Sequence, residues 1–106
     1  MALTLVQTLT SVGAAAETDI HTAVGDEQLV IHIVNESGGA GTITGLSIST
    51  TTITQNTAGN LLPTGEPIAD GQTIIIDKVF MNTTTPKLVL KSSVAVSAVV
   101  SGWSDV

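Results

Sequence analysis

The stretch from Glu27 to Asn35, EQLVIHIVN, constrains the fold more than any other part of the chain. In an extended strand Leu29, Ile31 and Ile33 point to one side, and Val30, His32 and Val34 point to the other. Turn-forming Gly, Asp, Asn and Ser residues close both ends of the stretch. A strand that is apolar on both faces predicts a position in the middle of a sheet, with side chains packed above and below it.

Composition favours strands along the whole chain. Hydrophobic residues make up 42% of the 106 residues, but aromatic residues only 2%, so the core must be built from Val, Ile, Leu and Ala. Seventeen Thr and nine Ser supply much of the polar surface. Short and β-branched side chains of this kind fit a pleated sheet better than a helix.

Several further stretches have the alternation or the length of strands. We predict strands within residues 17–24, 42–49, 72–81, 87–91 and 94–101. Gly45 is a candidate bulge, and a bend is expected near Asp77 and Lys78. The Gly-rich residues 37–41 are interpreted as a flexible turn that joins two hairpin partners.

Residues 2–12, ALTLVQTLTSV, alternate between leucine and threonine. Leu3, Leu5 and Leu9 share one side, while Val6 lies on the threonine side, where a partner could cover it. This pattern is typical of a half-buried edge strand or of an extended arm that orders on docking, and the sequence leaves both open.

Together these features predict an all-β fold with a single domain over residues 1–106. The expected architecture is one antiparallel β-sandwich, or a small jelly-roll-like barrel, of about seven to eight strands, with residues 2–12 as either an N-terminal arm or an edge strand. A chain of this length buries about 65% of its unfolded surface, so it can form a core without disulfides.

The formal net charge is −6, and residues 1–77 hold eight acids and neither Lys nor Arg. A chain this acidic is not expected to bind nucleic acid. The apolar runs are much shorter than the roughly 20 residues of a membrane helix, and the N-terminus lacks the pattern of a signal peptide, so no membrane partner is expected.

Catalytic and metal-binding patterns are sparse. The absence of cysteine excludes disulfides, thiolate metal sites and a cysteine nucleophile. His21 and His32 are the only histidines, and a satisfied or rim position is expected for His32, which lies on the two-sided apolar strand. The acids between 17 and 27 could gather a calcium ion, but they lack the spacing of a calcium loop. We therefore expect no catalytic residues, no metal, no cofactor and no small-molecule substrate.

Three large apolar residues have two interpretations each. Trp103, near the C-terminus, either plugs one end of the sandwich or anchors an interface. Leu61 and Leu62, in a polar loop, either cap the core or form a contact patch. The candidate interface residues are Leu3, Leu5, Val6, Leu9, Leu61, Leu62 and Trp103.

The overall pattern resembles that of small β-sandwich virion proteins of tailed bacteriophages. The resemblance is carried by the Leu/Thr stretch at 3–9, by LVIHIVNESGGAGTITGLSI at 29–48 and by PIADGQTIIIDKVFMN at 67–82. It continues in KLVLKSSVAVSAVVSG at 87–102 and a short acidic tail. The segment from Ile31 to Ser37 is similar to an I-H-x-x-N-x-S/G stretch of that family.

This resemblance implies a non-enzymatic structural protein of the virion, assembled in the bacterial cytoplasm. The leading expectation is a capsid decoration (cement) protein, a homotrimer that docks on the major capsid protein. A neck or tail accessory protein is the alternative within that class. A carbohydrate-binding sandwich is the alternative from another class, although such modules stack sugars on exposed aromatic rings and this chain has only Phe80 and Trp103.

Overall fold

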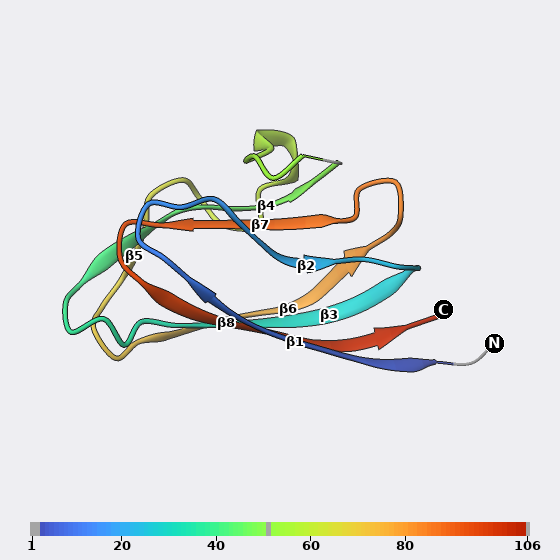
Figure 1. Ribbon diagram of the computed structural model, residues 1–106, viewed down its shortest axis with the longest axis horizontal. Helices are drawn as coiled ribbons and strands as arrows, with labels where there is room; N and C mark the ends of the chain where they lie inside the picture. The colour runs from blue at the N-terminus through green and yellow to red at the C-terminus, as the bar shows by residue number, and fades with distance from the viewer. Residues whose placement is uncertain (1–2, 51, 106) are drawn as a thin grey trace.

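The computed structural model describes residues 3–50 and 52–105. Eight strands and one 3-10 turn make up the regular structure of this part of the chain (Figure 1). In chain order they are β1 (Thr4–Val12), β2 (Thr18–Thr22), β3 (Glu27–Val34), β4 (Gly41–Ser49), η1 (Thr57–Gly59), β5 (Glu66–Ile68), β6 (Thr73–Met81), β7 (Lys87–Ser92) and β8 (Val96–Ser104).

The strands form two antiparallel four-stranded sheets that pack face to face (Figure 1). The first sheet has the order β1-β8-β3-β6, and the second has the order β2-β7-β4-β5. The chain crosses between the sheets at every connection except the one from β4 to β5. This order of eight strands in two sheets is that of a jelly roll. The predicted all-β sandwich class is therefore confirmed, with the strand number at the upper end of the expected range.

The core between the two sheets is aliphatic, as the composition requires. Leu29, Ile31 and Ile33 of β3 are fully buried, and so are Leu88 and Leu90 of β7. Burial of each such side chain contributes about 1.5–3 kcal/mol relative to exposure, so short β-branched and aliphatic residues suffice for this sandwich. The predicted inward sets of 87–91 and 94–101 are confirmed, the latter as Val96, Ala98 and Val100 with Val94 half-buried.

β3 lies between β8 and β6, in the interior of the first sheet, as its apolar character predicts. The expectation that side chains pack on both sides of it is wrong for the chain alone. Val30, His32 and Val34 are half-buried on the side away from the core, where neighbouring side chains of the same sheet flank them and no second layer of described residues covers them.

Residues 4–12 form an ordinary edge strand of the sandwich. β1 pairs with β8 without a break, from Thr4 opposite Ser104 to Val12 opposite Val96. Val12 is buried in the core, and Val6 packs against it from the inner side of the strand. The edge-strand alternative is therefore confirmed over 4–12, and the arm alternative does not hold there; Ala2, which belongs to the same predicted stretch, lies outside the described residues.

The predicted hairpin around residues 37–41 is wrong. β3 and β4 lie in different sheets, and the connection between them crosses the end of the sandwich. Asn35 fixes this crossing: its buried side-chain amide donates hydrogen bonds to the carbonyl oxygens of Gly39, at 2.8 Å, and Ile68, at 3.3 Å. Local turn chemistry could not reveal this, because Gly-rich turns serve hairpins and sheet crossings equally well.

Both predicted irregularities are present. On β4 the register against β7 shifts between Ile43 and Gly45, and a Cβ atom at Gly45 would lie 2.6 Å from Gln55 Oε1. On β6 the register against β3 shifts where Asp77 and Lys78 insert one extra residue, with Lys78 at a φ of 57°. The extra residue reverses the alternation beyond it, so Phe80 shares a side with Ile75 rather than with Ile74 as a simple strand would require.

A loop over residues 52–60 covers part of the second sheet (Figure 1). The Gln55 side-chain amide donates to the carbonyl oxygens of Gly45 and Val89, and Asn60 bridges to Ser47 of β4. Val89 is completely buried as a result, although it points away from the core. In the described chain, no helix is long and apolar enough to cross a membrane.

Candidate functional site: the outer face of the first sheet

The side of the first sheet that points away from the core is the most distinctive surface of the molecule. We call it the outer face. Its residues follow from the strand registers, except Leu3, which precedes β1 and lines a cavity together with Phe80 and Trp103. They are Leu3, Leu5, Gln7, Leu9 and Ser11 at and before β1, Ser97, Val99, Ser101 and Trp103 on β8, Gln28, Val30, His32 and Val34 on β3, and Thr73, Ile75 and Phe80 on β6.

Two rows of large side chains cross the outer face from one sheet edge to the other. The first row runs from Leu5 through Trp103 and Gln28 to Phe80. The second, four residues along β1, starts at Leu9 and passes Val99 and His32 to Ile75. Since neighbouring strands lie about 4.8 Å apart, each row spans about 14 Å.

These side chains are exposed to a degree that is unusual for large apolar groups. The exposed fraction is 64% for Leu5, 71% for Leu9, 65% for Phe80 and 52% for Trp103. Scattered exposed apolar residues are normal, but a contiguous group on one face marks an interaction surface. None of the sixteen outer-face residues is Asp, Glu, Lys or Arg, and the exposed charged residues of the first sheet, Asp77 and Lys78, lie in the bulge on its β6 edge.

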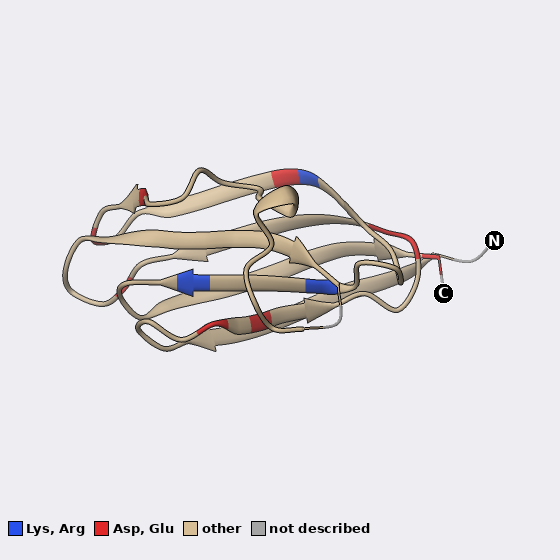
Figure 2. Ribbon diagram, turned by 90° about the horizontal axis from the view of Figure 1, so that it is seen from above, with Lys and Arg blue, Asp and Glu red and all other residues tan. Residues whose placement is uncertain are grey.

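The opposite side of the molecule has a different character. The second sheet carries Lys87 and Lys91 on β7 and Asp19 on β2, and the 52–60 loop lies over part of it. Figure 2, which looks onto this sheet, shows both lysine positions along one strand. Lys87 Nζ lies 3.3 Å from Asp19 Oδ2, so these two side chains form an ion pair within the second sheet. The outer face is thus the uncovered side of the sandwich, and the exposed Asp77 and Lys78 lie at its β6 edge.

A shallow cavity of about 310 Å³ lies at the aromatic end of the outer face. Its lining combines Leu3, Phe80 and Trp103 with the carboxylate-bearing residues Asp26 and Asp105. Asp26 and Asp105 are joined by two hydrogen bonds. The Asp26 backbone amide donates to Asp105 Oδ1 at 2.9 Å, and the Asp105 backbone amide donates to the Asp26 carbonyl oxygen at 3.1 Å. The outer face therefore ends in an acidic rim beside its two aromatic rings.

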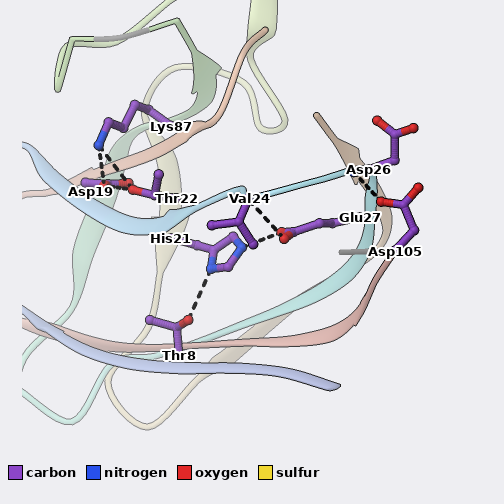
Figure 3. A network of polar contacts seen from close by, with 9 residues as sticks. All are labelled: Thr8, Asp19, His21, Thr22, Val24, Asp26, Glu27, Lys87 and Asp105. Atoms are coloured by element: carbon purple, nitrogen blue, oxygen red, sulfur yellow. Dashed lines mark hydrogen bonds and ion pairs between the residues drawn. The ribbon is translucent and has the colours of Figure 1, made fainter. Parts of the chain in front are cut away.

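Beneath that corner lies a buried polar network (Figure 3). His21 Nε2 is 2.5 Å from Glu27 Oε1, and the other ring nitrogen is 3.1 Å from the Thr8 hydroxyl. The second Glu27 oxygen accepts a hydrogen bond from the Val24 amide at 3.2 Å. This network ties β1, β2 and β3 together, and it gives both ring nitrogens of His21 a partner.

The structure brings together four of the seven predicted interface residues and separates the other three. Leu3, Leu5, Leu9 and Trp103 all belong to the outer face, so Trp103 does not plug the end of the core. Val6 points to the inner side, and Leu61 and Leu62 are partly buried against the core, where they act as caps.

Sequence reasoning missed the half of the outer face that β6 and β3 supply. Simple alternation along residues 72–81 would put Phe80 and Ile75 on opposite sides of their strand, whereas the bulge at Asp77 and Lys78 puts them on the same side. The expected bend was the available signal, since a single extra residue reverses the alternation beyond it.

The described residues do not form a metal centre. Asp19 contacts Lys87 and Thr22, Glu27 contacts His21, and Asp26 is joined to Asp105, so the acids that precede β3 are distributed among different partners. Within residues 3–50 and 52–105, no group of three His, Cys, Asp or Glu side chains could hold a metal ion.

Comparison with protein-family models, with curated proteins and with solved structures finds no match to the chain. The jelly roll itself is shared by capsid proteins, lectins and enzymes of the cupin type. Fold alone therefore assigns no activity, and the function has to be argued from the outer face.

Proposed function

We propose that the protein is a non-enzymatic structural protein of a tailed-phage virion, which decorates the head by docking its outer face on the major capsid protein. The observation that carries this proposal is the exposed apolar surface of the first sheet, where two rows of large side chains lie together and the exposed Asp77 and Lys78 are confined to the β6 edge. The sequence resemblance to phage virion proteins supplies the assembly in which such a surface would be used.

The composition of the outer face fits a protein partner. Aromatic residues and large aliphatic residues dominate the energetically important centres of protein interfaces, whereas Lys, Asp and Glu are depleted there. Trp103 and Phe80 would act as anchors, and the acidic rim at Asp26 and Asp105 would meet basic groups of the partner. Burial of one large apolar side chain contributes about 1.5–3 kcal/mol, so the six apolar side chains of the two rows can together support a stable contact.

The charge distribution disfavours the other large classes of partner. The net charge of −6 opposes binding to a nucleic-acid backbone and to anionic lipid headgroups. The proposed partners are therefore the capsid protein and further copies of this chain.

A binding assay with capsids tests the proposal. Capsids of the parent phage that lack the protein should bind the purified chain on co-sedimentation, and the double substitution Trp103→Gln and Phe80→Gln should weaken binding by at least about a hundred-fold, since two anchors are lost. Ile53→Gln is the matched control, because Ile53 is 47% exposed in the loop over the second sheet. Binding that survives the double substitution, or that the control removes, would contradict the assignment of the outer face.

One observation favours a second candidate function, sugar binding. Trp103 and Phe80 flank the Gln28 amide in the same row, about 10 Å apart across two strand spacings. Two rings with an amide between them could hold a saccharide. Trp103 is the only tryptophan, so its fluorescence would report a bound sugar directly. Saturable quenching by an oligosaccharide would favour this candidate over capsid decoration.

A further inference from the structure

The two sheets have four edge strands, and these differ sharply in how they are protected. β1 and β6 are the edges of the first sheet, and β2 and β5 are the edges of the second. An edge strand offers unpaired backbone N–H and C=O groups to any other strand. Proteins block unwanted pairing with short edges, charged residues, prolines and bulges.

Three of these four edges carry such protection. β6 has the bulge at Asp77 and Lys78, which places two charged residues on the edge. β5 is only three residues long and contains Pro67. β2 has five residues, a register shift after Asp19, and a charged pair with Lys87.

β1 has none of these features. It is nine residues long, TLVQTLTSV, and contains no charged residue and no proline. Its register against β8 continues without a bulge over the whole strand, and β8 is its only neighbour among the described strands of the sheet. A flat, uncharged edge of this length favours pairing with another strand.

We propose that β1 pairs antiparallel with β1 of a second copy of this chain, about a two-fold axis at Thr8, the middle of the strand. In this register Val6 lies opposite Thr10 of the other copy on the inner side, and Gln7 lies opposite Leu9 on the outer side. Leu5 faces Ser11 in the same way. Although the chain carries a net charge of −6, no like charges meet in the pairing, because β1 is neutral.

The protected edges decide between a two-fold and a head-to-tail arrangement. A homotrimer, which the sequence resemblance implies, could use strand pairing only if β1 met a different edge of its neighbour. Each of those edges carries a bulge, a charge or a proline. A two-fold pairing uses β1 twice, closes the assembly at two copies and leaves no unprotected edge for further growth.

The pairing would also enlarge the candidate docking surface. An antiparallel partner related by an axis perpendicular to the sheet keeps both outer faces on the same side. The result is one eight-stranded sheet in which the two copies of Leu5 and Leu9 lie near the centre. This inference holds whatever the partner of the outer face is, so its failure would leave the proposed function standing.

Light scattering coupled to gel filtration tests the dimer through a charge swap. The full chain should have the mass of two copies. The double variant Gln7→Lys with Leu9→Lys places like charges opposite each other twice and should weaken dimerisation by about ten-fold or more. The double variant Gln7→Lys with Leu9→Glu places opposite charges in the same positions and should restore the dimer.

Ile75→Lys is the matched control, because it adds the same charge to the outer face at the far edge of the sheet. It should leave the dimer intact, whereas a dimer formed by packing two outer faces would dissociate. A monomeric or trimeric wild-type protein would overturn the proposal. Equal dimerisation of the two double variants would also overturn it, and so would loss of the dimer in Ile75→Lys. Cooperative thermal unfolding of each variant confirms that it is folded.

Discussion

Two residues next to the aromatic end of the outer face, Gly102 and Glu27, hold its strands in position. Gly102 immediately precedes Trp103 on β8, with a φ of 157°, and its α-carbon lies against the backbone of β3. Glu27 begins β3 one residue before Gln28, which lies between the two aromatic rings, and it is fixed by His21 and the Val24 amide. The exposed rings therefore depend on contacts that are themselves buried.

Gly102 tolerates no side chain. A Cβ atom there would lie 2.0 Å from the Gln28 carbonyl oxygen and 2.9 Å from the Leu29 α-carbon, and backbone cannot move aside as a flexible side chain can. We expect Gly102→Ala to lower the free energy of unfolding by about 2–3 kcal/mol in urea denaturation. Gly13→Ala is the control, since a Cβ atom at Gly13 has nothing within 4 Å. Equal stability of the two variants would show that β8 and β3 can separate at no cost.

Removing the carboxylate of Glu27 should also destabilise the fold. Glu27→Gln keeps the size of the side chain, but it weakens the buried contacts with His21 and the Val24 amide. We expect a loss of about 2 kcal/mol in the free energy of unfolding. The exposed Glu36→Gln should change it by less than about 0.5 kcal/mol. A Glu27→Gln variant as stable as Glu36→Gln would mean that the network contributes nothing to the fold.

At the scale of elements, β1 shows what a sequence pattern can and cannot specify. Its leucines and threonines alternate clearly, so the strand itself could be predicted. The expectation that a partner covers Val6 on the threonine side is wrong, because that side faces the core of the same chain. The structure directs Val6 and Val12 inward and leaves Leu5 and Leu9 outside, because the pairing with β8 aligns Val12 with the buried Val96.

Deleting residues 3–12 tests whether β1 belongs to the folding unit. A detachable arm could be removed without loss of cooperative unfolding. β1 instead contributes a complete set of strand pairs, the buried Val12 and the Thr8 contact with His21. We expect the truncated chain to lose its sharp thermal transition or to melt at least about 10 °C lower. A truncated chain with unchanged unfolding would show that residues 3–12 are an independent arm.

The sheet partners of the strands could not be predicted from local signals. Strand existence followed from alternation, and a bulge was predicted at Gly45, while only a bend was predicted at Asp77 and Lys78, where the structure has a bulge. The crossing from β3 to β4 is held by the side chain of Asn35, which donates hydrogen bonds to carbonyl oxygens more than thirty positions away. Long-range contacts of this kind leave no periodic trace in the sequence.

At the scale of the whole molecule, the two sheets divide the surface into unlike halves. The second sheet is charged and partly covered by the 52–60 loop, while the outer face of the first is bare and apolar. The candidate site was partly predictable, since Leu3, Leu5, Leu9 and Trp103 were named from the sequence. The contribution of β6 appears only when the bulge places Phe80 and Ile75 on the same side.

The outer face should be dispensable for folding. Replacing Leu9 and Ile75, both at least 60% exposed, by glutamine removes apolar surface from water without removing core contacts. We expect the free energy of unfolding to change by less than about 1 kcal/mol, and binding of a hydrophobic dye such as ANS to fall clearly. A large loss of stability would instead show that the two rows support the sheet itself.

The most direct test of the central claim is a cryo-electron microscopy map of the parent virion at side-chain resolution. The account predicts density for the jelly roll repeated over the capsid lattice, with Trp103, Phe80 and Leu9 buried against the major capsid protein and the second sheet facing solvent. Density confined to one vertex or to the tail would move the protein to the neck or tail. A lattice position with the outer face turned to solvent would contradict the docking surface, and absence from the particle would contradict the virion assignment altogether.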